Sequence, residues 1–299
     1  KKKATVVEKK TNAFYDEYLL SNGIRVQVKK TDFKQEEILM SAISKGGTSL
    51  LDEKEMPTIL LLNDLITIGG VGDFSQTDLN KVLAGKHVSV KPHINLYTER
   101  FTGYSSPADF ESMLQLIYLY FNQVRFSKKD FKTYMSNLES NLTNYEKNPK
   151  ISFFDTINST LYNNHIRKQR IKKEMLPAVN YKQAKKMYKK RYLNSDEFIF
   201  TFVGNIDFDS TENLILRYLG ALPKQKQKEN FKNIHLNPIK GVHLKEFSKD
   251  MEIEKSSIFI SYNWDLAYSL ENQIKLNILS QILNIIFTEE IREKEGGTY

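Results

Sequence analysis

The sequence predicts an α+β fold in which an antiparallel sheet is covered by helices. Short β-prone runs dominate the first hundred residues, and several long amphipathic segments then follow one another between residues 110 and 192. The regular alternation of strand and helix that a doubly wound parallel sheet requires is absent from that stretch. The length of 299 residues favours two domains, because one domain averages about 100–200 residues.

Six strands are expected in a first module. They cover residues 14–20, 24–28, 38–43, 87–90, 95–104 and 198–203. Asn22-Gly23 joins the first two, and its glycine accepts the positive φ angle of a tight hairpin turn. Gly204-Asn205 closes the last strand.

Helices are expected where apolar residues recur every three to four positions. They cover residues 57–68, 106–123, 127–148, 151–162, 181–192 and 211–219. The first of these is too densely apolar for a surface helix, which indicates a buried position. Ser106 and Ser127 are the expected N-terminal caps of the second and third helices.

A change in composition separates this module from the next. Residues 224–240 are rich in lysine and amide side chains and have almost no hydrophobic periodicity, as expected for an exposed linker. The expected first domain is therefore residues 1–223. The expected second domain is the beginning of a similar module, at residues 241–299.

The second module is predicted to contain strands at residues 242–247 and 258–262 and a long apolar helix at 270–287. About 60 residues are too few to enclose such a helix, so we expect this module to be incomplete. The chain begins with Lys1-Lys2-Lys3 rather than with methionine, which is consistent with a fragment of a longer protein.

The excess of basic residues is concentrated in one stretch. The chain has 44 Lys and Arg against 36 Asp and Glu, and eleven of the basic residues lie between His165 and Arg191, where Glu174 is the single acid. A solvated helix face, the attraction of an acidic or polyanionic partner, and nucleic-acid binding are three interpretations. No base-stacking signature accompanies the charge, so the first is favoured and no nucleic-acid partner is expected.

Several kinds of site are excluded or disfavoured. The chain has no cysteine, which excludes disulfides, thiolate zinc sites and cysteine nucleophiles. No apolar run approaches the roughly 20 residues of a membrane span. His87 and His93 are six residues apart and fall on one face of a strand, a spacing compatible with a metal site, but no carboxylate lies near them in sequence. We expect ordinary surface histidines there.

The end of the sequence carries the most specific signal. Residues 291–299 read IREKEGGTY and place Arg292 and Tyr299 seven residues apart around a Gly-Gly turn. This segment resembles the Arg/Tyr motif of the pitrilysin/insulinase family of inverted-zinc metallopeptidases, which includes mitochondrial processing peptidase. Three further segments resemble that family in the same order, namely LSNGIRV at 20–26, GGTS at 46–49 and VGNID at 203–207.

The helix after the Gly-Gly-Thr-Ser segment departs from the family pattern. An active domain carries His-x-x-Glu-His there, two zinc ligands one turn apart with a glutamate as general base. In this chain residues 57–65 read PTILLLNDL and contain no histidine. No metal and no other cofactor is therefore expected in this chain, and the resemblance assigns the zinc to the N-terminal half of a parent protein.

The resemblance implies that the chain is the C-terminal, non-zinc-binding half of a zinc metalloendopeptidase and is inactive alone. It would form part of a substrate chamber with the N-terminal half of the same polypeptide, and peptides or unfolded proteins would be the substrates. Arg292 and Tyr299 would reach the zinc site of the other half and hydrogen-bond the substrate near the scissile carbonyl.

Two alternatives stay open at this stage. One is a non-catalytic relative that binds peptides or assembles with other subunits, and the other is a basic binding module centred on residues 167–191. The resemblance to two-half bacterial relatives also implies a periplasmic or otherwise exported location, although a cytoplasmic one agrees equally well with the absence of cysteine.

Overall fold

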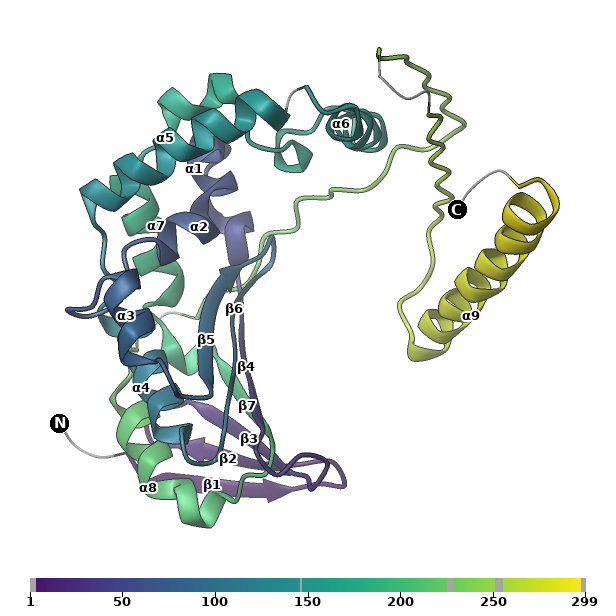
Figure 1. Cartoon of the computed structure of the whole chain (residues 1–299). Helices are drawn as coiled ribbons and strands as arrows, with labels where there is room; N and C mark the ends of the chain where they lie inside the picture. The colour runs from purple at the N-terminus through teal and green to yellow at the C-terminus, as the bar shows by residue number, and fades with distance from the viewer. Residues whose placement is uncertain (1–3, 146, 225–227, 251–254, 297–299) are drawn as a thin grey trace. The chain divides into compact units, whose positions relative to one another are not determined.

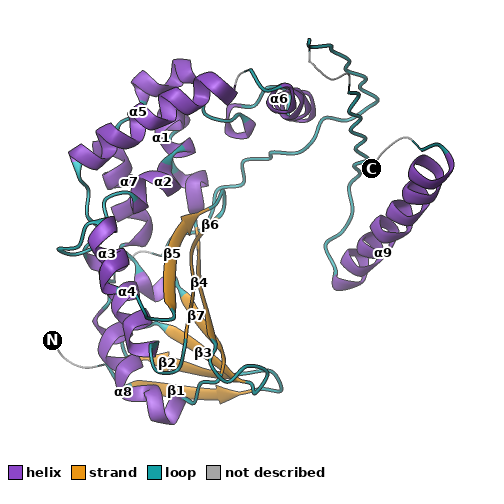
Figure 2. Ribbon diagram, in the orientation of Figure 1, coloured by secondary structure: helices purple, strands orange, loops and turns teal. Residues whose placement is uncertain are grey.

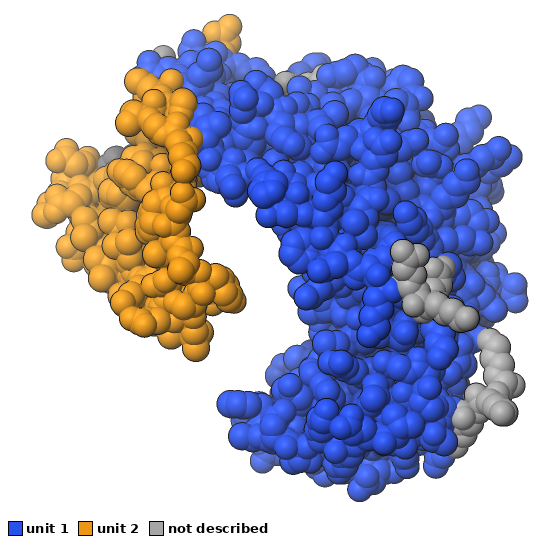
Figure 3. Space-filling view, turned by 180° about the vertical axis from the view of Figure 1, so that it is seen from behind, with its two compact units in different colours: residues 1–239, 245–249 blue, residues 240–244, 250–299 orange. Residues whose placement is uncertain are grey.

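The structure is a computed structural model that describes residues 4–145, 147–224, 228–250 and 255–296 (Figure 1). The chain divides into two compact units (Figure 3). Unit 1 comprises residues 1–239 and 245–249, and unit 2 comprises residues 240–244 and 250–299. The domain limits expected from the sequence stay a prediction.

Unit 1 is built on a mixed sheet in which seven strands are described. The strands are β1 (Val6–Thr11), β2 (Asp16–Leu20), β3 (Arg25–Lys30), β4 (Ile38–Lys45), β5 (Val88–Ile94), β6 (Thr98–Ser105) and β7 (Ile199–Gly204). Their order across the sheet is β1-β2-β3-β7-β4-β6-β5, so β1 and β5 are the edges. Every neighbouring pair is antiparallel except β3 and β7, which run parallel.

Helices pack against one face of this sheet (Figure 2). The α-helices described in unit 1 are α1 (Met56–Leu60), α2 (Leu62–Thr67), α3 (Gln76–Val82), α4 (Phe110–Asn122), α5 (Lys128–Tyr145), α6 (Pro149–Leu161), α7 (Tyr181–Tyr192) and α8 (Phe208–Tyr218). Aromatic side chains fill the core between the helices and the sheet. Phe110 of α4 meets Phe202 of β7 edge to face, and Phe101 of β6 is fully buried beside Phe121 of α4.

The predicted α+β class is confirmed. Gly23 has the positive φ of 94° that the Asn-Gly hairpin requires, and the Ser127 hydroxyl accepts the N–H of Asp130 at the start of α5. The expected helix at residues 57–68 is interrupted at Leu61, whose φ of −101° and ψ of 3° separate α1 from α2. The parallel pair β3–β7, the edge strand β1 and the helix α3 were not predicted.

Unit 2 contains one long helix, α9 (Leu270–Phe287), followed by a π-helical segment, η7 (Thr288–Lys294). The helix has the bounds that the sequence predicts, whereas the strands expected at residues 242–247 and 258–262 are wrong. A strand needs a neighbour for its N–H and C=O groups, and no described strand of the sheet pairs with either segment. No helix in the described ranges combines the length and apolar character of a membrane span.

Candidate functional site

Of the two predicted site residues, only Arg292 belongs to the part of the chain that the structure describes. It lies on η7 with an exposed side chain, and its Nε is 3.7 Å from a carboxylate oxygen of Glu293. Tyr299 lies outside the described residues. Gly296, the first residue of the expected Gly-Gly turn, has a φ of 62°, a left-handed conformation that glycine adopts without strain.

The polar side chains of the helix that would carry the zinc ligands have structural partners. The Asn63 amide donates to the carbonyl oxygen of Ile94 (3.1 Å) and accepts the N–H of the same residue (2.8 Å), which fixes α2 to the end of β5. Asp64 accepts the Tyr134 hydroxyl at 2.8 Å. Thr58 is fully buried, and its Oγ1 accepts the N–H of Asn180.

The histidines are not gathered with acidic residues. His93 is exposed on β5, and the His87 ring contacts the Tyr104 ring with centroids 4.9 Å apart. Within the described ranges, no group of three or more His, Asp or Glu side chains could hold a metal ion.

The structure places a buried polar site at the glycine loop, by which we mean residues 46–49. Thr48 and Ser49 donate their N–H groups to the carbonyl oxygens of Asn95 and Leu96, at 2.9 and 2.7 Å, so the loop lies directly on the β5–β6 turn. Gly47 has a φ of 63°, and a Cβ atom there would be 2.5 Å from both of these carbonyl oxygens. Only glycine therefore fits this position without a shift of the backbone.

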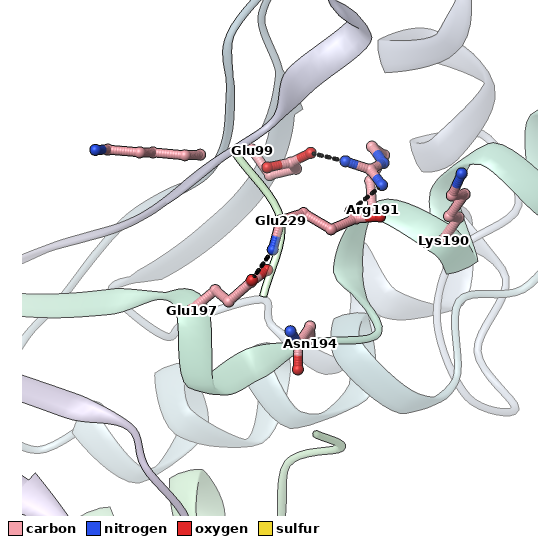
Figure 4. A pocket seen from close by; sticks show the side chains of 7 residues that line it. Glu99, Lys190, Arg191, Asn194, Glu197 and Glu229 are labelled. Carbon is pink, nitrogen blue, oxygen red and sulfur yellow. Dashed lines mark hydrogen bonds and ion pairs between the residues drawn. The ribbon is translucent and has the colours of Figure 1, made fainter. Parts of the chain in front are cut away.

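A buried ion pair lies beneath the loop (Figure 4). The side chains of Glu99 on β6 and Arg191 on α7 are each 1% exposed. One Glu99 oxygen accepts both the Gly47 N–H (2.8 Å) and an Nη of Arg191 (3.2 Å). Burial raises the pKa of Glu99 to about 7, and the charge of Arg191 and the Gly47 N–H offset only part of that rise.

The network extends into the segment that follows the core of unit 1, residues 228–239, which we call the strap. The Glu229 carboxylate accepts the second Nη of Arg191, and the Glu229 N–H donates to Glu197 (Figure 4). Burial also raises the pKa of Glu197, which lies in the turn Ser195–Glu197. Arg191 therefore bridges β6 and the strap from its place on α7.

Further contacts hold the strap on the glycine loop. The Lys232 N–H donates to Oγ of Ser49 at 3.0 Å, and the Phe231 and Tyr97 rings contact each other with centroids 5.1 Å apart. The Ile239 N–H donates to the carbonyl oxygen of Leu161. Residues 228–239 of the linker expected from composition thus make specific contacts with the rest of unit 1.

The pocket around this network has a volume of about 310 Å³ and is polar. Its lining residues are Lys45, Glu99, Lys190, Arg191, Asn194, Glu197 and Glu229. The chain's own donors occupy the three carboxylates, and the network joins the glycine loop, α7 and the strap. This arrangement supports a structural clamp, and it offers no nucleophile with an adjacent base.

Comparison with known families extends this description. Residues 178–299 match the family described as the Peptidase M16 inactive domain. These 122 of the 299 residues resemble the inactive domain of M16 peptidases. The match agrees with the family resemblance expected from the sequence motifs, and its description as an inactive domain agrees with the missing His-x-x-Glu-His motif.

Two curated relatives of this chain are described as zinc proteases. A probable zinc protease PqqL from Haemophilus influenzae is 22% identical over 287 residues, covering 95% of the chain and 30% of the relative. A zinc protease PQQL-like protein from Arabidopsis thaliana is 26% identical over 296 residues, covering 95% of the chain and 28% of the relative. The chain thus spans less than a third of either relative.

Among solved structures, the periplasmic protease PqqL from Escherichia coli has the same fold. It superposes with a TM-score of 0.65 at 20% identity, over 77% of this chain and 25% of that protein. At 20% identity this similarity shows that the two proteins share a fold, and it shows nothing about activity.

Proposed function

We propose that the chain is the non-zinc half of a zinc metalloendopeptidase and forms part of the wall of a chamber for extended peptides. The observation that carries this proposal is that residues 178–299 match an M16 inactive domain, while Thr58 of α1 and Asn63 and Asp64 of α2 make structural contacts in the segment where an active domain would carry its zinc ligands. The proposed partners are the N-terminal half of the same polypeptide, which holds the zinc, and peptide or unfolded protein substrates.

The sheet of unit 1 supports the proposed wall. Within the described part of unit 1, helices lie on one face only (Figure 2). On the opposite face Leu39 pairs with Tyr104 and Ile43 pairs with Ile199 across neighbouring strands. All four side chains are exposed, from 36% for Ile199 to 48% for Leu39. Clustered exposed apolar groups suit contact with the apolar side chains of an unfolded substrate.

We further propose that Arg292 and Tyr299 contact the substrate carbonyl at the zinc site of the other half. Attack of water on an amide develops negative charge on the carbonyl oxygen, and a guanidinium or phenol hydroxyl directed at it stabilises the transition state more than the ground state. Two features support this role. Arg292 is exposed and lies beside the exposed neighbouring Glu293, and the φ of Gly296 permits a chain reversal before Tyr299.

The test uses the full-length protein with Arg292→Ala and Tyr299→Phe. Loss of one such donor costs about 2.7–4 kcal/mol, so kcat for a peptide substrate should fall roughly a hundred- to a thousand-fold. Zinc content and melting temperature should stay near wild type, and Glu293→Gln, a change at the adjacent exposed residue, should leave kcat unaltered.

Two results would overturn parts of this proposal. Wild-type kcat in both variants would reject the roles of Arg292 and Tyr299. A full-length protein that neither binds zinc nor cleaves peptides would reject the peptidase and select the non-catalytic relative. The proposed location is the periplasm or another exported compartment, as for the similar PqqL of Escherichia coli, which is described as periplasmic.

A further inference from the structure

Eight of the eleven basic residues in the stretch 165–191 form two groups in the structure, namely its three arginines and the five lysines of α7. The arginines hold the fold together. The Arg167 side chain is 4% exposed and donates to Glu53 and to the carbonyl oxygens of Thr48 and Leu51. Arg170 pairs with Asp155, and Arg191 lies in the buried network.

The lysines of α7 form the second group. The buried face of this helix consists of Ala184, Met187, Tyr188, Arg191 and Tyr192. The exposed face consists of Lys182, Lys185, Lys186, Lys189 and Lys190, which we call the lysine face. Their spacing of three and four residues places all five on one side of the helix, along roughly 12 Å of its axis.

The lysine face is not neutralised within the described ranges. No carboxylate there forms an ion pair with any of the five ammonium groups, and α7 itself contains no acidic residue. Other helical segments differ in this respect. Lys275 of α9 pairs with Glu271, and Lys294 of η7 pairs with Glu290, each one turn away. On α7 the like charges one turn apart repel one another.

We propose that the lysine face of α7 is a docking surface for an acidic polypeptide segment. Charge complementarity selects an anionic partner, and roughly 12 Å of helix matches about four residues of extended chain at about 3.3 Å each. Nucleic acid fits less well, since the exposed residues of α7 include no aromatic ring for base stacking and no arginine fork for phosphate.

This surface is independent of the proposed peptide wall. The helix α7 packs against α1 and α2 within the helix layer (Figure 1). The exposed apolar side chains of the wall belong to β4, β6 and β7 of the sheet. Binding at the lysine face would therefore persist in a chain that lacks the wall contacts, and its test does not require peptidase activity.

The test measures binding of a fluorescent oligoglutamate peptide to the chain by anisotropy, with oligoglutamine as the uncharged probe. The triple variant Lys182→Gln, Lys186→Gln, Lys189→Gln removes three charges from the lysine face. Lys54→Gln, Lys81→Gln, Lys150→Gln removes three charges from scattered exposed positions and is the matched control.

We expect the first variant to weaken oligoglutamate binding roughly tenfold or more at about 50 mM salt, and the control variant to stay within about twofold of wild type. Replacement of the same three lysines by arginine keeps the charge and should retain binding. Circular dichroism establishes that each variant is folded.

Three results would overturn the proposal. Equal weakening in the two glutamine variants would mean that net charge alone attracts the peptide. Tighter binding of oligothymidylate than of oligoglutamate, lost in the first variant, would assign the lysine face to nucleic acid. Absence of oligoglutamate binding by the wild-type chain at about 50 mM salt would show that the lysine face does not bind acidic polypeptides.

Discussion

The buried Glu99 should make the chain less stable as pH rises from weakly acidic to weakly basic. Its pKa is about 7 in the folded chain against an ordinary value of 4.5. Between these two values the folded state binds a proton that the unfolded state has lost, so rising pH favours unfolding. At about 1.36 kcal/mol per tenfold difference in proton affinity, the free energy of unfolding should fall by about 3 kcal/mol across this window.

The variant Glu99→Gln isolates this contribution. Its amide oxygen can still accept the Gly47 N–H, and the amide does not titrate in this pH range. Because the other ionisable groups are common to both proteins, the difference in their unfolding free energies should change with pH mainly through Glu99. Urea unfolding at a series of pH values from about 4.5 to about 8 should show the variant gaining about 3 kcal/mol relative to wild type.

A difference that stays constant across the series would refute the reasoning, since Glu99 would then have the same pKa in the folded and unfolded chains. A change of the opposite sign would also refute it. In that case the attraction of Arg191 would outweigh the burial of the carboxyl and hold its pKa below the ordinary value.

Two further predictions concern the surroundings of this pair. A left-handed alanine costs roughly 1–2 kcal/mol of unfolding free energy. Gly47→Ala should cost more than this, because its Cβ would also clash with backbone atoms. Gly85→Ala should cost only the left-handed conformation, because Gly85 has a φ of 82° and no atom lies within 4 Å of its Cβ position. Urea unfolding compares the two, and equal losses would contradict the clash. Tyr192→Phe should cost about 1–3 kcal/mol, because the buried hydroxyl lies 3.1 Å from the carbonyl oxygen of His93. A melting temperature equal to that of wild type would contradict this role.

Helices with strong local signals could be predicted from the sequence. The bounds of α7 and α9 agree with the expected ranges because an apolar period of three to four residues fills each helix. In both, a polar side chain also caps the first turn. Asn180 accepts the N–H of Gln183, and Ser269 accepts the N–H of Asn272.

Elements that depend on distant partners could not be predicted in this way. The edge strand β1 has almost every side chain exposed, so it lacks a hydrophobic alternation and is held by its pairing with β2. The reverse error occurs at residues 242–247 and 258–262, whose β-prone composition finds no pairing partner in the described part of unit 2. Strand formation therefore follows from pairing more than from composition.

The positions of Glu99 and Arg191 on their elements carry a sequence signal for the buried network. Glu99 lies two residues before Phe101 and so shares its buried strand face, and Arg191 lies three residues after Tyr188 on the buried face of α7. A charged residue at an inward position of each element indicates a buried ion pair. The contacts of Arg191 with Glu99 and with Glu229 could not be predicted from the sequence. Arg191 is 92 positions from Glu99 and 38 positions from Glu229 along the chain.

The strand β7 lies at the centre of the sheet although it is the last of these strands to be synthesised. Before it emerges from the ribosome, the groups β1-β2-β3 and β4-β6-β5 share no hydrogen bonds with each other, and each has an unpaired edge. The segment between Ser105 and Ile199 takes roughly five to twenty seconds to translate. During that interval the edges of β3 and β4 lack a partner in addition to the outer edges of β1 and β5, and β7 pairs with both β3 and β4 when it joins the sheet.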